Sequence, residues 1–310
     1  MLEYTEIDRP SPRKGELLVD VAAAGVNYID TYHRSGGYPR DLPFVLGLEG
    51  AGTVAEVGAD VDGFAPGDRV AWMGVPGSYA EQVAISADAA VRVPDDIADE
   101  QAAAALLQGV TAQYLVTSTY PVRAGDDVLV HAAAGGVGLL LVQLAKARGA
   151  RVIGTVSTAE KEELARQAGA DEVIRYTEAD FSAETRRLTD GKGVRVVYDG
   201  VGRTTFEGSL ASLAPRGLLA LFGASSGPVP PFDPQRLNAA GSLYLTRPTT
   251  VHYTATPAEL RERAGEVFGA MAAGTLSVRI GGRYPLAEAA RAHEDLQGRR
   301  TTGKLLLTTG

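Results

Sequence analysis

The sequence predicts an α/β protein in which a β-rich domain accompanies a doubly wound parallel sheet. Three observations lead to this fold class. Short β-prone runs broken by glycine and proline fill the first third of the chain, strands and helices alternate through its middle, and a glycine-rich turn follows the first strand of the alternating part. Such alternation is typical of a parallel sheet with helices on both faces.

The first part of the chain reads as an all-β, barrel-like domain over residues 16–93. Turn signals at Pro66-Gly67-Asp68 and Pro76-Gly77-Ser78 separate its β-prone runs, which include 17–21, 52–57 and 68–72. A helix is expected next, over 99–117, because Ala102–Leu107 supplies strong helix formers.

The middle of the chain alternates regularly between strands and helices. The expected strands cover 128–130, 151–155, 172–174, 194–198, 218–222 and 242–245, and the helices 137–148, 159–168, 181–188 and 204–213. Six strands with intervening helices predict a doubly wound parallel sheet. Two further helices are expected at 258–271 and 286–296, followed by a strand at 304–307 that we expect to return to the N-terminal β domain.

The composition is that of a soluble globular protein. The chain has 310 residues, of which 45% are hydrophobic and 22% charged, and its formal net charge is −8. This acidic balance disfavours nucleic acid and anionic membranes as partners. Because no apolar run approaches a membrane span and no signal-peptide layout opens the chain, we expect a cytoplasmic protein. The lack of cysteine excludes disulfides, thiolate metal ligands and a cysteine nucleophile.

The most informative segment is the turn after the first strand of the alternating part. It reads Ala133-x-Gly135-x-x-Gly138, with alanine in the place of the usual first glycine. Gly135 lets the backbone approach a pyrophosphate, and Gly138 lets the helix pack closely on the strand. The N–H groups that open the helix then face the anion, so the turn predicts a dinucleotide-binding site.

The tip of the next strand indicates which dinucleotide binds. An NAD-specific site would place Asp or Glu there to hold the ribose 2′-hydroxyl, whereas this tip is Gly154–Thr158 with Lys161 one turn into the helix. Small hydroxyl residues and a cation suit a 2′-phosphate, which favours NADPH. The alternative is that Lys161 is a solvated lysine on the helix surface.

These segments resemble the quinone oxidoreductase (zeta-crystallin-like) group of the medium-chain dehydrogenase/reductase superfamily, over nearly the whole chain. The most specific marker is a long spaced pattern from Gly125-Asp126-Asp127-Val128-Leu129 through the glycine-rich turn to Gln143 and Lys146. Further similarity lies in the segments 25–32, 197–202 and 241–248.

The resemblance implies a GroES-like substrate domain split across both chain ends and a Rossmann domain between them. Accordingly we expect residues 1–113 to form the first part of the substrate domain, 114–250 the NADPH-binding domain, and 251–310 the return to the substrate domain. The resemblance also implies a homodimer joined through the last Rossmann strand, around Ser242–Leu245.

The resemblance places particular residues at the cofactor. By this resemblance, we expect Asn27, Tyr32 and Thr111 to lie near the nicotinamide, and Lys161 and Tyr176 to surround the 2′-phosphorylated adenosine. The full set of expected cofactor-binding residues is Ala134, Gly135, Gly136, Val137, Gly138, Thr155, Ser157, Lys161, Tyr176, Phe222, Gly223, Ser225, Thr246 and Arg247.

Relatives in this group begin with an additional strand and turn, and this chain starts at what would be that strand's far end. The alternatives are a shortened chain and an internal start at Met1. In a shortened chain we expect an unpaired sheet edge where the strand would lie.

The chemistry expected of this chain is independent of zinc. Zinc-dependent relatives place a cysteine and a histidine where this chain has Asn27 and Leu48, and its four histidines show no ligand spacing. Without a Lewis acid a quinone is an easier hydride acceptor than a simple ketone, because conjugation spreads the incoming charge. Asn27 and Tyr32 are the candidate donors, with Thr111 and Arg247 as helpers. Each of three candidates also has a structural alternative: Asn27 as a turn residue, Tyr32 as a packed ring and Arg247 as a loop cation.

The sequence therefore predicts an NADPH-dependent quinone reductase acting on a small conjugated carbonyl compound. The nearest alternative is an NADPH-dependent enone, alkenal or enoyl-thioester reductase. A hydrolase is suggested by Gly223-x-Ser225-x-Gly227, but that motif needs a helix directly after the serine, and a proline-rich segment follows instead. An RNA-binding or structural, crystallin-like role is disfavoured by the acidic balance and by the absence of an aromatic and basic stripe.

Overall fold

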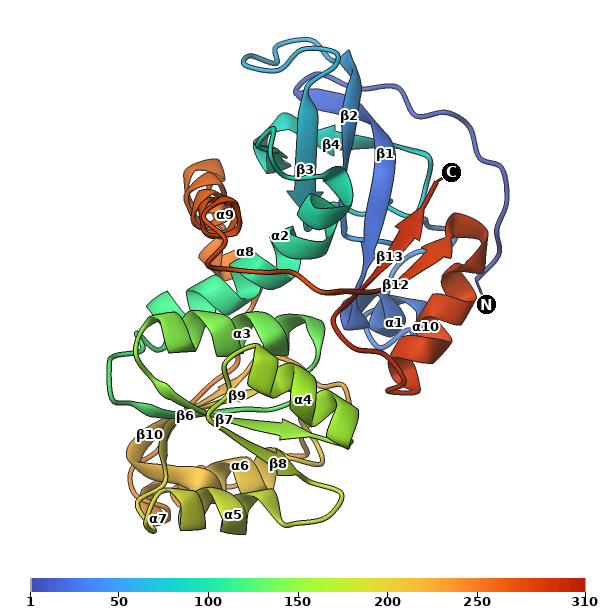
Figure 1. Ribbon diagram of the computed structural model, residues 1–310. Helices are drawn as coiled ribbons and strands as arrows, with labels where there is room; N and C mark the ends of the chain where they lie inside the picture. Colours follow the sequence, from blue (N-terminus) through green and yellow to red (C-terminus); the bar gives the residue numbers. More distant parts are fainter. Residues whose placement is uncertain (1, 310) are drawn as a thin grey trace. The chain divides into compact units, whose positions relative to one another are not determined.

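The computed structural model describes residues 2–309 and divides into two compact units (Figure 1). Unit 1 comprises Met1–Val110 and Thr254–Gly310, and unit 2 comprises Thr111–Tyr253. Unit 1 is thus assembled from both ends of the chain, whereas unit 2 is one continuous segment.

Unit 1 is built on a seven-stranded sheet. Its strands are β1 (Glu16–Val26), β2 (Glu49–Val57), β3 (Arg69–Met73), β4 (Gln82–Ser86), β5 (Ala90–Arg92), β12 (Ile280–Pro285) and β13 (Lys304–Thr308). The order is β12-β13-β1-β2-β3-β5, with β4 also paired to β1. Because β13 pairs antiparallel with β1, placing Leu306 opposite Gly25, the expected return of the last strand to the N-terminal β domain is confirmed.

The core of unit 1 lies against the central strand β1. Leu17, Val19 and Val21 pack with Leu305 and Leu307 of the closing strand. Asp20 and Ala22 on the opposite face of β1 are exposed, whereas Leu18 on that face is fully buried. The two chain ends therefore share one hydrophobic core.

The helices of unit 1 were only partly expected. The expected helices over 99–117, 258–271 and 286–296 correspond to α2 (Asp99–Tyr114), α9 (Pro257–Ala272) and α10 (Ala289–Gln297), with a 3-10 turn at Leu286–Glu288 before α10. The short helix α1 (Tyr28–Ser35) was not expected, nor was strand β12. Helix α1 begins after Asn27, whose backbone N–H donates to the Asp30 carboxylate at 2.8 Å, and ends at Gly36, which has a φ of 77°.

Unit 2 confirms the doubly wound parallel sheet. Its strands are β6 (Asp127–Val130), β7 (Arg151–Val156), β8 (Glu172–Arg175), β9 (Val194–Asp199), β10 (Leu213–Leu221) and β11 (Tyr244–Thr246), in the order β11-β10-β9-β6-β7-β8. All neighbouring pairs are parallel. Such strands are buried on both faces, which explains the unbroken apolar run at Val128, Leu129 and Val130.

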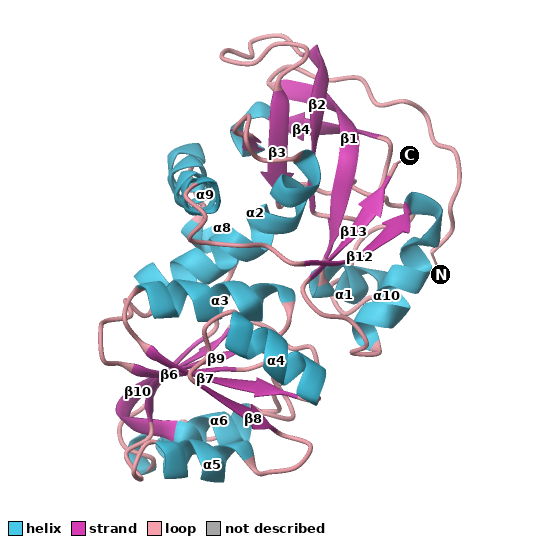
Figure 2. Ribbon diagram, in the orientation of Figure 1, coloured by secondary structure: helices cyan, strands magenta, loops and turns pink. Residues whose placement is uncertain are grey.

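Helices cover both faces of this sheet, as Figures 1 and 2 show. On one face lie α3 (Gly136–Ala147) and α4 (Ala159–Gln167), and on the other α5 (Phe181–Leu188) and α6 (Phe206–Ser212). The remaining helical segments are a π-helical turn at Leu115–Thr119, α7 (Gln235–Ala239) and α8 (Thr250–Tyr253). None of the helices within residues 2–309 is long and apolar enough to cross a membrane.

Strand β10 begins five residues before the expected strand at 218–222. Its pairing with β9 starts at Leu213 opposite Val194 and resumes only at Leu218 opposite Val196, so an irregular stretch separates the two regular parts. Pro215 lies in that stretch and has no N–H to give to a ladder. The proline-containing segment therefore continues the strand without regular pairing, which a pattern of apolar residues does not reveal.

Candidate functional site

The glycine-rich turn of unit 2 has the form that a dinucleotide cradle requires. Helix α3 starts at Gly136, directly after the turn, and Gly135 is its N-cap residue. The Gly135 N–H donates to the Ala132 carbonyl at 2.8 Å, closing the turn. A Cβ added at Gly138 would lie 2.2 Å from that same carbonyl oxygen, so only glycine lets α3 approach the turn this closely.

The departure from the usual motif, alanine at 133, is compensated on the neighbouring strand. Ala133 is fully buried, and its N–H donates to the Thr155 carbonyl at 3.1 Å. A Cβ added at Gly154 would lie 2.8 Å from the Ala133 Cβ. The missing side chain at Gly154 thus makes the space that the alanine methyl occupies.

This turn lies where the strand order of the sheet reverses. Strands β6 and β9 are neighbours, and the chain leaves them toward β7 on one side and β10 on the other. In open parallel sheets, ligands bind at the carboxyl ends of the strands at such a point. The N–H groups of the first turn of α3 have no acceptor within the helix, which suits them to an anion.

A buried chain of hydrogen bonds supports the turn from within. The two ring nitrogens of His131, Nδ1 and Nε2, lie 2.9 Å from Thr155 Oγ1 and 3.0 Å from Ser209 Oγ, and the Ser209 hydroxyl donates to Asp199 at 2.8 Å. Because the one Ser209 proton goes to the carboxylate, His131 Nε2 carries a proton and Nδ1 accepts from Thr155. Burial lowers the pKa of His131, which keeps the ring neutral.

The chain of hydrogen bonds through His131 determines where the Thr155 side chain points. Thr155 was expected among the cofactor-binding residues, and its hydroxyl is directed into the core, toward His131. The Thr155 side chain therefore fixes the tip of β7, and the Thr155 backbone carbonyl accepts the Ala133 N–H of the turn.

The segments that follow β9 and β10 lie side by side. The Phe222 N–H donates to the Asp199 carbonyl at 2.9 Å, and the Ser225 N–H to the Gly200 carbonyl at 3.2 Å. A Cβ at Gly223 would lie 2.5 Å from the Gly200 carbonyl oxygen, so this close approach needs glycine. Three expected cofactor residues thus line the same edge of the sheet as the glycine-rich turn.

The serine in this segment is not a nucleophile elbow. Residues 222–234 form no helix, and the first helix after Ser225 is α7, which begins at Gln235. The expectation that Gly223-x-Ser225-x-Gly227 lacks the strand–turn–helix of a hydrolase is therefore confirmed.

The residues expected at a 2′-phosphate lie in the segments that follow β7 and β8. Ser157 follows β7, Lys161 is half-buried in the first turn of α4, and Tyr176 follows β8 with an exposed fraction of 40%. The neighbouring acid Glu162 is paired with Arg166 at 2.9 Å and with Arg175 at 3.1 Å. Its negative charge is thereby compensated within the protein.

The other expected residues of unit 2 lie in two places. Thr246 ends β11, and the exposed Arg247 donates to the Pro248 carbonyl at 3.4 Å. Thr111 is buried near a stacked pair of rings, Tyr114 and Tyr253, whose centroids are 4.2 Å apart. Burial, partly offset by hydrogen bonds that include Thr250 and Thr111, raises the pKa of Tyr114 to about 12.

The candidate donors of unit 1 have different environments. Tyr32 of α1 is partly exposed, and its ring meets Tyr38 edge-on at 5.5 Å and 76°. Asn27 is buried at the start of the same helix. Its amide nitrogen donates to the Gly25 carbonyl at 3.2 Å and to Glu49 Oε2 at 3.0 Å, so both amide hydrogens have acceptors inside the unit.

Asn27 belongs to a buried ionic cluster that the sequence did not reveal. Lys304, the first residue of β13, donates to Asn27 Oδ1 at 2.8 Å and forms an ion pair with Glu49. Both charged side chains are 0% exposed. The second oxygen of Glu49, Oε1, accepts the Leu107 N–H of α2 at 2.7 Å.

A second buried polar chain starts from Asp30, one turn into α1. The Tyr79 hydroxyl donates to Asp30 Oδ2 and lies 3.0 Å from both that oxygen and Nε2 of His293. Within residues 2–309, Asp30 Oδ1 and His293 Nδ1 have no hydrogen-bond partner. Burial raises the pKa of Asp30 to about 7 and lowers that of His293 to about 4.

The sequence offered few signals for these two clusters. Lys304 opens an apolar strand, where a lysine is usually solvent-exposed. The partners are far apart in the chain, and Lys304 is brought to Glu49 and Asn27 by the β13–β1 pairing. Throughout residues 2–309, no three His, Cys, Asp or Glu side chains are grouped so that they could hold a metal ion.

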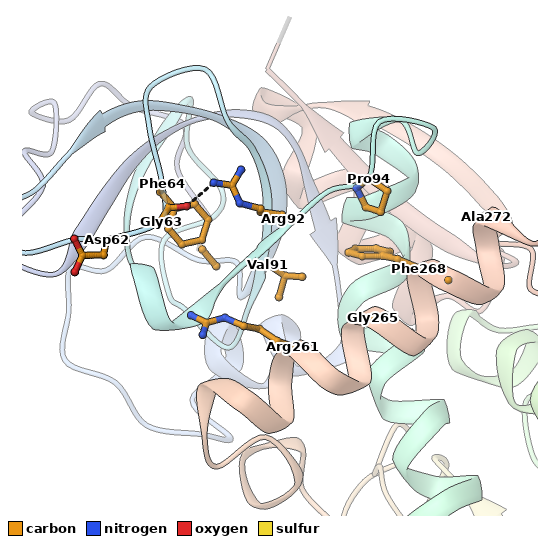
Figure 3. A pocket seen from close by; sticks show the side chains of 12 residues that line it. Asp62, Gly63, Phe64, Val91, Arg92, Pro94, Arg261, Gly265, Phe268 and Ala272 are labelled. Carbon is orange, nitrogen blue, oxygen red and sulfur yellow. Dashed lines mark hydrogen bonds between the residues drawn. The ribbon is translucent and has the colours of Figure 1, made fainter.

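Unit 1 also contains a hollow of about 620 Å³ beside α9, shown in Figure 3. Its wall combines the aromatic rings of Phe64 and Phe268 with the guanidinium groups of Arg92 and Arg261. Helix α9 also contributes Gly265 and Gly269. None of the residues that line this hollow is among the expected site residues.

Comparison with known proteins identifies two matching families. The family described as "Alcohol dehydrogenase GroES-like domain" matches residues 13–95, and "Zinc-binding dehydrogenase" matches residues 136–262. Among curated proteins, the quinone oxidoreductase of Pseudomonas aeruginosa is 49% identical over 99% of this chain and 95% of its own length. The 2-haloacrylate reductase of a Burkholderia species is 42% identical over 98% and 94%.

A solved structure adds information about the cofactor. A mycobacterial protein in complex with NADPH is 56% identical and superimposes with a TM-score of 0.96, covering 98% of this chain and 94% of its own. The likeness therefore extends over both units.

The Asp30 cluster predicts an unusual dependence of stability on pH. A carboxyl group whose pKa rises from 3.8 to about 7 on folding stabilises the folded state below pH 4, and this contribution is lost as the pH rises through 7. His293, with its pKa lowered from 6.5 to about 4, acts oppositely, because its contribution is lost as the pH falls from 6.5 to 4. In the wild type the two slopes offset each other.

Asp30→Asn removes one slope and leaves the other. As the pH increases from 4 to 6.5, the free energy of unfolding of the variant should increase relative to that of the wild type, by at most about 1.4 kcal/mol per pH unit. Urea unfolding at several pH values measures this difference, with Asp41→Asn at an exposed position as the control. Parallel curves for Asp30→Asn and the wild type would contradict the assignment.

Proposed function

The chain belongs to the quinone oxidoreductase family of the medium-chain dehydrogenases/reductases, and from this premise we propose that it is an NADPH:quinone oxidoreductase that works without zinc. The observation that carries the proposal is the strand–turn–helix of Ala133–Gly138 at the point where the sheet order reverses. No acidic residue occupies positions 154–158 at the tip of the following strand, as NADPH rather than NADH requires. The 56% identical mycobacterial structure in complex with NADPH supports this choice of cofactor.

The residues of unit 2 would hold the cofactor in three groups. Residues 134–138 would surround the pyrophosphate, with the backbone N–H groups of the first turn of α3 as its donors, because they have no intrahelical acceptors; the Gly135 N–H already donates to the Ala132 carbonyl. Ser157, Lys161 and Tyr176 would surround the 2′-phosphate. The nicotinamide half would lie along the segments 222–225 and 246–247, with Thr155 holding the strand tip through His131.

The cofactor supplies a hydride when bound, and the protein must align the acceptor and donate hydrogen bonds to its oxygen. Tyr32 is the candidate donor of unit 1 because its ring is partly exposed on α1. Asn27 is less suited to that role, since both of its amide hydrogens already have acceptors. The resemblance adds Thr111 and Arg247 as further candidates.

A second candidate function is the reduction of an activated alkene. It is favoured by the 42% identical 2-haloacrylate reductase, whose name describes an alkene conjugated to a carboxylate. The same donors would serve an enone, because conjugation carries the incoming charge to an oxygen atom in both cases.

We also propose a cytoplasmic homodimer. Strand β11 ends the six-stranded sheet, and its Tyr244 has an exposed fraction of 62%. An unpaired edge with an exposed aromatic side chain suits pairing with a second copy. Sedimentation of the purified chain measures this state.

Steady-state oxidation of NADPH with a panel of acceptors tests the function directly. We expect turnover with benzoquinones and naphthoquinones to exceed that with alkenals, 2-haloacrylate and enoyl thioesters. Chelator treatment should leave the rate unchanged, because the proposed chemistry uses no Lewis acid. A preference for alkenes would favour the second candidate, and loss of activity on chelation would overturn the zinc-independent mechanism.

Lys161→Ala tests the 2′-phosphate site. The variant should bind NADPH more weakly by about 1.5–3 kcal/mol, the range for a hydrogen bond to a charged group, with little effect on NADH. Fluorescence titration with both cofactors measures the difference, and Lys192→Ala at an exposed position of unit 2 is the matched control. Equal losses for the two cofactors would remove Lys161 from the 2′-phosphate site.

Tyr32→Phe tests the donor on α1. Loss of one hydrogen bond to a charged oxygen should lower kcat with quinones by about 10- to 100-fold while leaving the KM for NADPH unchanged. The exposed Tyr4→Phe serves as the control. Unchanged turnover would exclude the Tyr32 hydroxyl from the chemistry.

A further inference from the structure

The buried ion pair between Lys304 and Glu49 has a specific geometry. Both charged groups have further protein partners: Lys304 Nζ donates to Asn27 Oδ1 at 2.8 Å, and Glu49 Oε1 accepts the Leu107 N–H at 2.7 Å. Glu49 Oε2 faces both the ammonium group and the Asn27 amide nitrogen. The cluster therefore joins the start of β2, the start of β13, the middle of α2 and the N-cap of α1.

The backbone of β1 makes room for this cluster. A Cβ added at Gly25 would lie 2.3 Å from Glu49 Oε2 and 2.7 Å from Lys304 Cε. Because these atoms are held from two other strands, any side chain at Gly25 would displace the ion pair. The Gly25-Val26-Asn27 segment thus combines the space for the pair with the amide that the pair contacts.

The two charges determine how the Asn27 amide is oriented. An ammonium group only donates hydrogen bonds, so it must face the amide oxygen, and a carboxylate only accepts, so it must face the amide nitrogen. An amide flipped by 180° would bring donor against donor and acceptor against acceptor. The Gly25 carbonyl oxygen, which also only accepts, faces the amide nitrogen as well and favours the same orientation.

Stability alone does not explain such a pair. Taking two charges out of water costs several kcal/mol for each ion, and well-packed apolar side chains of similar volume often stabilise a fold as well or better. In some proteins a buried polar or ionic group instead serves to select one geometry. Here the geometry is that of Asn27, the residue directly before α1, and α1 is the helix that carries Tyr32.

We propose that the Lys304–Glu49 ion pair is a positioning device, which fixes the Asn27 amide and through it the first turn of α1 and the placement of Tyr32. Lys304, Glu49 and Asn27 are positioning residues in this arrangement, because they act on the reaction through α1. The effect on turnover rests on the proposed quinone reductase function, whereas the effect on α1 does not.

The test compares three variants with the wild type. Lys304→Met leaves Glu49 without its counter-charge, the double variant Lys304→Met/Glu49→Gln removes both charges with little change in volume, and Asn27→Ala keeps the ion pair but removes the amide. Lys14→Met is the matched control, because Lys14 forms an exposed ion pair with Asp60 in the same unit. For each protein the melting temperature, kcat with a benzoquinone and the KM for NADPH are measured.

We expect Lys304→Met to lower both the melting temperature and kcat. The double variant should regain most of the melting temperature, since no unpaired charge remains, yet its kcat should stay about 10²-fold below that of the wild type. Asn27→Ala should show a similar loss of kcat, and the KM for NADPH should be unchanged throughout. Recovery of wild-type kcat in the double variant would overturn the proposal, because the pair would then serve stability alone.

Amide hydrogen exchange of residues 28–35 provides a readout that does not depend on activity. Exchange in α1 should be about tenfold faster in the double variant and in Asn27→Ala, and unchanged in Lys14→Met. Unaltered exchange in α1 would overturn the positioning role even if Lys304→Met fails to fold. A wild-type chain that lacks quinone turnover would instead overturn the proposed function, while the exchange data would still decide the role of the ion pair.

Discussion

The antiparallel pairing of β13 with β1 is the interaction on which the arrangement of unit 1 depends. It brings the last strand of the chain against the first and gives Leu305 and Leu307 to the core beside β1. The same register carries Lys304 into the interior, where Glu49 and Asn27 provide its partners. Without this pairing, Glu49 would lack its counter-charge and the start of α1 would lose a contact.

Unit 2 depends on a different constraint, the close approach of backbone to backbone around the glycine-rich turn. Gly138 and Gly223 occupy positions where any side chain would meet a carbonyl oxygen, and Gly154 makes room for Ala133. Below these contacts, the chain of hydrogen bonds from Thr155 through His131 and Ser209 to Asp199 joins β6, β7, β9 and α6. Close steric fit thus holds the glycine-rich turn, and a chain of hydrogen bonds with defined donors and acceptors supports the strands next to it.

The sequence predicted much of unit 2 because its signals are local. Apolar runs, glycine spacing and alternation of strands and helices are all readable within some thirty residues, and the six parallel strands follow from them. In unit 1 the decisive contacts join distant positions. Lys304 looks like a surface lysine until β13 is paired, and Asp30 and His293 meet only through Tyr79. The direction of the Thr155 hydroxyl likewise depends on tertiary contacts.

The split of unit 1 has a consequence for the order of events during synthesis. Unit 2 is complete once residue 253 has left the ribosome, and it can then fold as one continuous segment. Unit 1 must wait for β13, so its central strand lacks a neighbour and Glu49 lacks its ammonium partner until residue 304 has emerged. A nascent chain stalled shortly before that point would carry unit 2 complete and unit 1 unfinished, with Glu49 and the core-facing side of β1 still without their partners from β13, a state that chaperones and proteases would recognise.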